Sequence, residues 1–501
     1  MSSSVNKDKK IAIIGSGVFG LSSAYHLAKK GYNHITVYDR GDYDNNQFSP
    51  LRGANGASTD ISKLVRFSYL DKVHYQNLAL EALGVFNEWN KELVEAKATD
   101  PSFPEALKDI DSIYTNNGYL RLDDIDNGEE KDNLNSFAKI GLRDFSYDLN
   151  NEKDTWRAKL TGWSDKLDPL DIASKIDNLY GVLDTISGVA LADKSLVWIK
   201  YLSKKLSNGT IKFLYGPEVG EVIELINKNG EVVTSAVETF GEHITSVKTK
   251  DGTLHEADYV VIAAGGWTPN FIPEEILPRI ESVGSTYILL KISDKLIPKY
   301  KNIPQINWRL QYAKEAPERG GVYIFPSTDD GILKIGADDH YWRYFSCNNG
   351  YSVPKTEISS LPKKSLLVYQ NFIREFLPDV ANDEDSYAVG FKVCFTARGQ
   401  RNELIVDYAP KKLFDNLIFA SGGGFHSYKF LPVIGKFVEG LISGETYEYA
   451  ELLKFDAIDA DRYTYKEVKD PYDPRALNNT ELSTFKKDTS PVPIKEFLFL
   501  Q

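Results

Sequence analysis

The sequence predicts an α/β fold in which a parallel sheet is assembled from distant segments and interleaved with an antiparallel sheet. An apolar run at residues 10–14 leads into the glycine-rich turn from Gly15 to Gly20 and then into a helical pattern. Two later apolar runs, 260–264 and 417–420, also end in glycines, as buried parallel strands beside a ligand do. The segments between them alternate apolar and polar residues, which favours antiparallel strands. The parallel sheet is therefore expected to be discontinuous along the chain.

The first glycine-rich turn has the pattern G-x-G-x-x-G, which is typical of a Rossmann-type dinucleotide-binding domain. Gly15 permits a tight turn, Gly17 lets the backbone approach a pyrophosphate, and Gly20 lets helix and strand pack closely. Asp39 ends the next apolar strand, 24 residues after Gly15, where a carboxylate can accept hydrogen bonds from a ribose. Further contacts to the dinucleotide are expected of six residues: Val18, Phe19, Arg40, Ser62, Val219 and Gly265.

The placement of these segments divides the chain into two interleaved domains and a tail. The expected boundaries are 1–92, 183–272 and 402–452 for the dinucleotide-binding domain, 93–182 and 273–401 for an α+β substrate domain, and 453–501 for a C-terminal extension. Within the substrate domain we expect one hairpin over 113–120, with Asn-Gly at its turn, and a second over 322–336. The tail carries many charges and four prolines, so we expect it to wrap the surface.

Composition restricts the class of protein. The chain has 501 residues, of which 42% are hydrophobic, so more than one well-buried core is expected. A net charge of −12 without a basic run argues against nucleic acid and anionic membrane as partners. Two cysteines, Cys347 and Cys394, cannot build a disulfide framework, and no apolar run is long enough to span a bilayer. We expect a monomer in the cytoplasm that binds a small molecule; the chain does not end in the peroxisomal S-K-L signal.

Missing motifs narrow the chemistry further. The sequence contains no H-E-x-x-H and no G-x-x-x-x-G-K-[ST], and its seven histidines are scattered. Metal-dependent hydrolysis and P-loop phosphoryl transfer are therefore disfavoured, and no metal site is expected. A dinucleotide fold without those motifs favours redox chemistry, in which the cofactor performs the difficult step.

Three segments place reactive side chains in settings that favour such chemistry. Lys63 and Arg66 are three residues apart, so on a helix they would share one face. Lys334 stands alone in an apolar strand, where an unpaired ammonium group would be costly to bury. Cys394 precedes Asp407 by thirteen residues.

A fourth segment, 422–432, places Phe425 and Lys429 after three consecutive glycines. In this order, and over roughly residues 10 to 450, the four segments resemble the fungal fructosyl amino acid oxidases, or amadoriases. These belong to the sarcosine oxidase group of D-amino-acid-oxidase-like flavoproteins. The resemblance implies FAD as cofactor, in a Rossmann-type domain interleaved with an antiparallel substrate domain.

The resemblance also implies roles for single residues. Lys334 would lie near flavin N5 and help oxygen to accept electrons, because a positive charge stabilises developing superoxide. Asp338 would contact the amine or the sugar of the substrate. Cys394 would form a thioether to the flavin 8α-methyl group, and Lys429 would bind the substrate carboxylate.

The remaining implied contacts lie around the flavin ring. Lys63 and Arg66 would lie over one face of it, with Arg66 also reaching the substrate. Gly424, Phe425 and Lys429 would complete the pocket, where backbone N–H groups of the glycine segment face the pyrimidine oxygens.

Each assignment has an alternative without chemistry. Lys334 could point to solvent from an edge strand, and Cys394 could be an apolar filler. Asp338, Lys429 and the pair of cations at 63 and 66 could be solvated surface groups.

The function implied is an FAD-dependent oxidase of the C–N bond of an N-substituted amino acid, with a fructosyl amino acid as first candidate. Its products would be the free amino acid, glucosone and hydrogen peroxide. Saccharopine, pipecolate and sarcosine remain alternative substrates, because Gln400 and Phe425 depart from the pattern of the group. A nicotinamide-dependent dehydrogenase and a flavin-binding protein without turnover remain alternatives from other classes.

Overall fold

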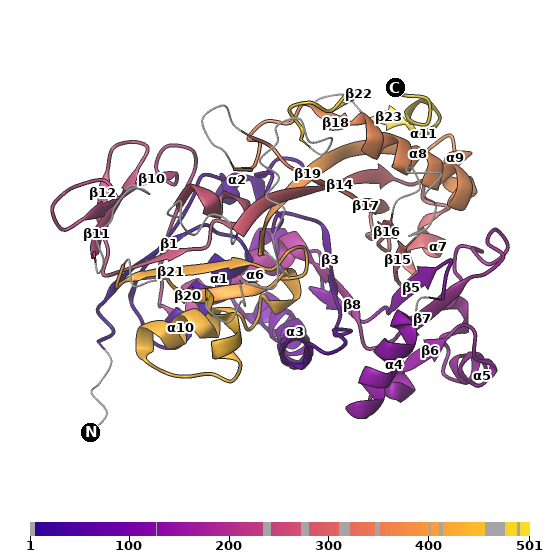
Figure 1. Ribbon diagram of the computed structural model, residues 1–501, viewed down its shortest axis with the longest axis horizontal. Helices are drawn as coiled ribbons and strands as arrows, with labels where there is room; N and C mark the ends of the chain where they lie inside the picture. Colours follow the sequence, from indigo (N-terminus) through magenta and orange to yellow (C-terminus); the bar gives the residue numbers. More distant parts are fainter. Residues whose placement is uncertain are drawn as a thin grey trace.

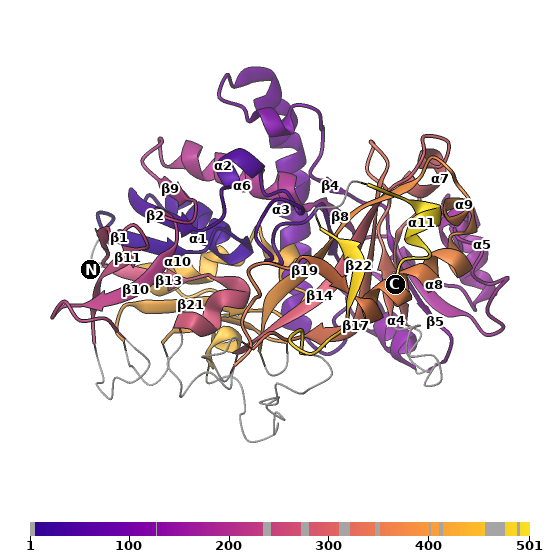
Figure 2. The ribbon, with the colours of Figure 1, turned by 90° about the horizontal axis from the view of Figure 1, so that it is seen from above.

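Two large sheets lie side by side in the computed structural model (Figures 1 and 2). The structure describes residues 6–126, 128–233, 242–271, 280–309, 321–345, 351–399, 402–409, 414–455, 476–487 and 491–501, without the side chains of 338–340. Among these residues no helix is both long and apolar enough to cross a bilayer.

The first sheet has six strands and contains the glycine-rich segments predicted from the sequence. Its strands in order are β20 (Leu404–Tyr408), β21 (Leu417–Gly422), β13 (Tyr259–Ile262), β1 (Lys10–Ile14), β2 (His34–Asp39) and β9 (Lys212–Tyr215). All pairs are parallel except β20 with β21. The prediction that distant segments assemble one mainly parallel sheet is therefore confirmed.

This sheet is buried on both faces, which explains its near-continuous apolar strands. Alternate residues such as Ile13 and Val261 pack in one core with helices α1, α3, α6 and α10. The helix bounds are α1 (Val18–Lys29), α3 (Val73–Thr99), α6 (Ala192–Leu206) and α10 (Gly435–Ser443). On the opposite face, Ile14 and Ile262 pack against a three-stranded sheet formed by β10 (Val222–Asn227), β11 (Ile244–Thr249) and β12 (Leu254–Glu256).

The second sheet has nine strands. They are, in order, β23 (Val492–Pro493), β19 (Tyr387–Gly399), β14 (Ile280–Lys291), β17 (Ile332–Trp342), β16 (Val322–Ile324), β15 (Gln305–Arg309), β5 (Tyr119–Asp123), β7 (Tyr180–Asp184) and β6 (Ser146–Asp148). One face packs on α8 (Lys363–Phe376) through residues such as Leu333 and Ile335. Side chains alternate along a strand, so Lys334 lies on the other face.

Short elements connect and cover the two sheets. A three-stranded sheet has the order β3 (Ser62–Val65), β8 (Gly188–Leu191), β4 (Tyr114–Thr115), and β18 (Ser360–Pro362) pairs with β22 (Leu482–Lys486). The short α-helices are α2 (Tyr43–Asn46), α4 (Glu129–Lys139), α5 (Glu152–Leu160), α7 (Ile297–Lys301), α9 (Pro378–Ala381) and α11 (Ile494–Phe497). The 3-10 helices are η1 (Glu105–Leu107), η2 (Arg143–Phe145), η3 (Ser164–Lys166), η4 (Gly265–Phe271), η8 (Tyr428–Phe430) and η9 (Ala450–Leu453).

Two local predictions are wrong because pairing with distant strands overrides local pattern. Lys63 lies in strand β3, not in a helix, since residues 62–65 pair with β8. The hairpin expected over 113–120 does not form: β4 pairs with β8, whereas β5 pairs with β15 and β7. The hairpin expected over 322–336 is confirmed, with β16 and β17 antiparallel.

The C-terminal segment is more than a surface wrap, so that expectation is also wrong for its described part. Strand β23 extends the nine-stranded sheet beyond β19, and β22 pairs with β18. Phe485 and Phe497 are buried in the core on the α8 side of the sheet. The end of the chain therefore contributes to the core of the second domain.

Two helical glycines provide a test of the packing between α1 and the glycine-rich turn. A Cβ atom at Gly20 would lie 1.8 Å from the carbonyl oxygen of Gly15, whereas a Cβ at the exposed Gly84 in α3 would meet nothing within 4 Å. We expect Gly20→Ala to lower the free energy of unfolding by about 1–3 kcal/mol or more, because helix and turn must separate. Gly84→Ala is expected to raise it by about 0.5–1 kcal/mol, because alanine favours the helix. Chemical denaturation measures both; equal effects would contradict the packing described.

Candidate functional site

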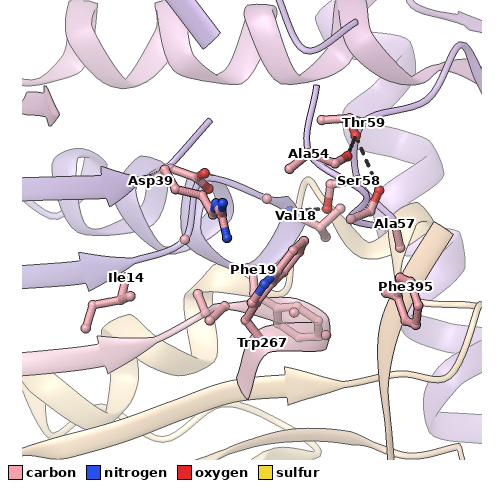
Figure 3. Close-up of a pocket in the computed structure, with 18 of the residues that line it drawn as sticks. Ile14, Val18, Phe19, Asp39, Ala54, Ala57, Ser58, Thr59, Trp267 and Phe395 are labelled. Atoms are coloured by element: carbon pink, nitrogen blue, oxygen red, sulfur yellow. Dashed lines mark hydrogen bonds between the residues drawn. The ribbon is translucent and has the colours of Figure 1, made fainter. Parts of the chain in front are cut away.

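A cavity lies at the carboxyl ends of β1, β2 and β13, where ligands of parallel sheets bind. Figure 3 shows Asp39 at one end, Phe395 at the other, and Val18, Phe19 and Trp267 between them. The glycine-rich turn forms one wall, and the segment 263–267 another. The cavity is therefore elongated, with the predicted dinucleotide loop at its side.

The glycine-rich turn is held by backbone geometry that only glycine satisfies. Gly15 has φ +109°, and a Cβ there would lie 2.3 Å from the carbonyl oxygen of Ala263. Asp39 braces the turn by accepting hydrogen bonds from the N–H groups of Ser16 and Gly41, both at 2.8 Å. Burial raises the pKa of Asp39 despite these bonds. The side chain also lines the cavity.

Most of the predicted dinucleotide contacts line this cavity. Gly15, Gly17, Val18, Phe19, Asp39, Arg40 and Gly265 are all among its lining residues. Val219 does not line it and is 44% exposed; its successors Gly220 and Glu221 do. Ser62 also lies outside the lining, and its carbonyl oxygen accepts a hydrogen bond from Lys334.

A second cavity, of about 570 Å³, continues from the first and contains most of the other predicted residues. The two share five lining residues: Val18, Ala57, Ser58, Thr396 and Ser427. The second is lined by the predicted Lys63, Arg66, Lys334, Cys394, Gly424, Phe425 and Lys429. Its volume suits a small-molecule ligand. The structure thus brings together side chains from β3 and the residue that follows it, from β17 and β19, and from the segment that leads into η8.

Lys334 is buried beside a carboxylate that sequence reasoning did not assign. Its Nζ lies 2.5 Å from Oδ2 of Asp60, and Lys63 Nζ lies 2.8 Å from the same oxygen. Burial opposes ionisation of Asp60, but the two ammonium groups lower its pKa to about 2. Burial lowers the pKa of Lys334 to about 8, although Asp60 acts in the opposite direction. The solvent-facing alternative for Lys334 is therefore excluded.

Aromatic rings enclose the rest of the Lys334 ammonium group. Its Nζ lies 4.6 Å from the ring centroids of both Tyr287 and Phe325. Such contacts stabilise a desolvated cation by about 2 kcal/mol. The lysine is thus held in one position on the cavity floor.

Cys394 lines the second cavity from β19 and is 3% exposed. Its Sγ lies 3.7 Å from the carbonyl oxygen of Gly56. Two residues earlier on the same strand, Lys392 donates a 2.6 Å hydrogen bond to the carbonyl oxygen of Thr59. Burial lowers the pKa of Lys392 to about 8. Sequence reasoning missed this second lysine, although a lone lysine in an apolar strand was the signal used for Lys334.

Lys429 belongs to a second group of basic side chains, which lies at another wall of the cavity. Its Nζ donates to the hydroxyl oxygen of Tyr69 at 2.9 Å, and Tyr69 also pairs with Nδ1 of His426 at 2.9 Å. The guanidinium carbon of Arg66 lies 4.7 Å from the ring centroid of Tyr69. Burial lowers the pKa of Lys429 well below its ordinary value, and Arg66 adds to this. The surface alternative for Lys429 is excluded, and Tyr69 and His426 are partners that the sequence analysis missed.

Arg66 and Lys429 lack an acidic partner, unlike Lys334. In the described part of the chain, neither forms an ion pair with a carboxylate. Arg66 instead donates to the carbonyl oxygen of Ser68. A cavity that holds a half-buried arginine and a buried lysine, both without an acidic partner among the described residues, is suited to an anionic ligand.

Asp338, predicted at the substrate, belongs to β17, but its side chain lies outside the described residues. Phe425 is 38% exposed, and its ring stacks on Tyr341 with centroids 5.5 Å apart. Among the described residues, no three side chains of the His, Cys, Asp and Glu types gather as a metal site.

The joined cavities fit a flavin dinucleotide. The glycine-rich turn and Asp39, which would hold the pyrophosphate and a ribose, line one end, and Cys394 and Lys334 lie in the continuation of the same space. At Gly422, next to this space, a Cβ would lie 2.4 Å from the carbonyl oxygen of Glu403, so the backbone there needs glycine.

Comparison with known proteins agrees with this geometry. L-saccharopine oxidase of Schizosaccharomyces pombe is 25% identical over 455 residues, covering 88% of this chain and 91% of that protein. The fold is similar to fructosamine oxidase (amadoriase II) of Aspergillus fumigatus, with 21% identity, TM-score 0.67 and 96% of each chain covered. It is also similar to fructosyl peptide oxidase of E. terrenum, with 22% identity, TM-score 0.66, and 89% and 92% covered.

The family model described as FAD dependent oxidoreductase (DAO) matches residues 10–195 and 219–441, which is most of the chain. The match includes the glycine-rich turn, Lys334, Cys394 and Lys429. The resemblance to the flavoprotein group that the sequence indicated is therefore confirmed, and the chain belongs to the DAO family of FAD-dependent oxidoreductases.

Proposed function

We propose that this FAD-dependent oxidoreductase oxidises the C–N bond of an N-substituted amino acid, with oxygen as the final electron acceptor. The observation that carries the proposal is that Arg66 and Lys429, which have no acidic partner among the described residues, line the same cavity as Lys334 and Cys394. When bound, FAD supplies the acceptor for the two electrons of the substrate. Water then hydrolyses the imine that the substrate becomes, and oxygen with two electrons and two protons gives hydrogen peroxide.

The substrate carboxylate is proposed to bind between Arg66 and Lys429. Burial disfavours the ammonium form of Lys429, so a nearby carboxylate would restore its charge. The hydroxyl group of Tyr69 holds Lys429 in place, and the ring of Tyr69 supports the guanidinium of Arg66. These contacts fix both donors before the ligand arrives, which reduces the entropy lost on binding.

Two substrates fit this proposal. A fructosyl amino acid, which would give the free amino acid and glucosone, is supported by the activities that the names of similar solved structures state. Saccharopine is supported by the name of a relative of similar length. Both present a carboxylate beside an oxidisable C–N bond. Asp338 is proposed to contact the substrate amine or sugar.

Oxygen uptake with a substrate panel tests the reaction and the carboxylate site together. The panel contains fructosyl-valine, fructosyl-lysine, saccharopine, pipecolate and sarcosine. We expect at least one to stimulate uptake, and Lys429→Met to lower kcat/KM for it by at least about 100-fold, because a buried charge partner is lost. Lys436→Met, which removes a half-buried lysine outside the cavity that pairs with Glu81, is the matched control and should change little. No uptake with any member would contradict the proposed substrate class.

The charge of Lys334 is proposed to assist the transfer of electrons to oxygen. Its pKa is lowered to about 8, so the ammonium loses its proton as the pH rises through 8. We expect the rate of reoxidation by oxygen to fall about tenfold between about pH 7 and 9, as the protonated fraction does. Stopped-flow mixing of reduced enzyme with oxygen measures this rate.

Two variants distinguish the effect of Lys334 from that of Lys392, a nearby lysine with a similar pKa. Lys334→Met should be slow and independent of pH over the same range. Lys392→Met should keep the wild-type profile, although the pKa of Lys392 is also lowered to about 8. If only Lys392→Met loses the pH dependence, the effect comes from Lys392, and the role proposed for Lys334 is contradicted.

Cys394 is proposed to hold the flavin covalently through a thioether. The thiol lines the same cavity as Lys334, and its Sγ lies 3.7 Å from the carbonyl oxygen of Gly56. We expect the yellow colour to stay with acid-precipitated wild-type protein and to be released from Cys394→Ser. The mass of the denatured chain provides a second readout. Release of all colour from the wild type would refute the thioether, and a bound nicotinamide would refute FAD chemistry altogether.

A further inference from the structure

The imidazole ring of His426 is held at both of its nitrogens. Nε2 makes a hydrogen bond to the backbone carbonyl oxygen of Asn402, and Nδ1 lies 2.9 Å from the hydroxyl oxygen of Tyr69. A carbonyl oxygen can only accept a hydrogen bond, so Nε2 carries a proton. Burial lowers the pKa of His426 well below its usual value, and the charge of Lys429 adds to this. The ring is therefore neutral, with a lone pair on Nδ1.

This tautomer sets the direction of the next hydrogen bonds. Because Nδ1 has no proton, Tyr69 donates its hydroxyl proton to the ring. The oxygen of Tyr69 is then an acceptor for Lys429, whose Nζ lies 2.9 Å away. The same Nζ also donates to the backbone carbonyl oxygen of His426. His426 thus acts on Lys429 twice, once directly and once through Tyr69.

Two acceptors around Nζ favour the ammonium form of Lys429. An ammonium group has three N–H donors, so it can satisfy both acceptors and keep one N–H for a ligand. A neutral amine has only two N–H groups and would present its lone pair to the cavity, where it would repel a carboxylate. The two acceptors therefore oppose burial and the charge of Arg66, which both lower the pKa of Lys429.

The other charged and titratable groups around the ring cannot replace His426 as the partner of Tyr69. Arg66 and Lys72 act on His426 through their positive charges, and neither can accept a proton from a phenol. The ring of Tyr75 in α3 packs 5.3 Å from the imidazole, but its hydroxyl oxygen already accepts a hydrogen bond from a backbone N–H. In the described part of the chain, the hydroxyl of Tyr69 thus faces one base.

We propose that His426 is a positioning residue for carboxylate binding: by accepting the proton of Tyr69, it turns the hydroxyl oxygen toward Lys429 and favours the charged form of that lysine. The inference rests on the proposed function, since it takes Lys429 as a ligand of the substrate carboxylate. A side chain without an acceptor in place of Nδ1 would free the proton of Tyr69 to turn toward the amine and stabilise its uncharged form.

The pH dependence of carboxylate binding tests this role. The probe is (methylthio)acetate, in which sulfur replaces the oxidisable nitrogen, and its binding to the holoenzyme is followed by flavin absorbance between about pH 5 and 10. For the wild type we expect the Kd to rise about tenfold per pH unit above the pKa of Lys429 in the free enzyme. In His426→Leu this rise should begin about one pH unit lower, so that binding at higher pH is about tenfold weaker.

Three variants separate this effect from a loss of packing. His426→Gln provides an amide oxygen for Tyr69 and an N–H for Asn402, so it should keep the wild-type profile. Tyr69→Phe should also start the rise at lower pH, and His426→Leu should add nothing to it, because both act through one hydroxyl group. The matched control is His26→Leu, since His26 also faces a carbonyl oxygen, that of Pro432, but does not line either cavity; its profile should stay unchanged.

The position of the ring proton gives a second readout that needs no binding. Nitrogen-15 shifts of histidine-labelled holoenzyme distinguish protonated from unprotonated ring nitrogens, and the signals of His426 are those lost in His426→Gln. We expect the proton on Nε2. A proton on Nδ1 would reverse the chain and overturn the inference, even if His426→Leu does not fold.

The outcomes separate this inference from the proposed function. If His426→Leu weakens binding equally at every pH, the histidine has only a structural role, and the carboxylate site at Lys429 stands. If (methylthio)acetate does not bind, or binds Lys429→Met as tightly as the wild type, the carboxylate site of the proposed function fails as well.

Discussion

The arrangement of the site depends on one buried carboxylate. Asp60 is fully buried and holds Lys334 and Lys63 on a single oxygen, so Lys334 meets two residues that lie far from it in the sequence. The pairing with Asp60 offsets part of the cost of burying Lys334, since an isolated charge in a protein interior costs several kcal/mol. The same contacts connect β3, which precedes the first long helix, with β17 in the nine-stranded sheet. A single ionic cluster thus aligns the two halves of the molecule.

The second constraint is the length of β14 and β19. These strands pair along residues 280–291 and 387–399, and their far ends reach the six-stranded sheet, where Phe395 and Thr396 line the dinucleotide cavity. Cys394 and Lys392 point from the same strand toward the loop at 56–59. Because one rigid strand carries contacts to both cavities, the position of a bound dinucleotide and that of the second cavity are set together.

Much of the fold could be predicted because its signals are local. Gly15, Gly20 and Asp39 have fixed spacing in a strand-turn-helix unit, and apolar strands ending in glycine marked β13 and β21. The helix expected at Lys63 and the hairpin expected at Gly118 failed because both depend on pairing with β8, β7 and β15, which no local pattern encodes. A tertiary partner overrides weak local propensity in this way.

The basic residues of the site could be predicted from the sequence, but the side chains that contact them could not. Lys334 and Lys429 were found because a lysine in an apolar setting demands an explanation. Asp60, Tyr69 and His426 were missed because an aspartate or a tyrosine in a loop looks like any solvated residue until the fold buries it.

The depressed basicity of Lys429 has a consequence for ligand binding. A lysine that burial holds partly uncharged gains a proton when a carboxylate arrives beside it, so binding and proton uptake are linked. The empty pocket then avoids an uncompensated charge, and the occupied pocket contains a matched pair. A carboxylate ligand would therefore bind together with one proton, which charges the lysine. Its affinity would decline as the pH rises.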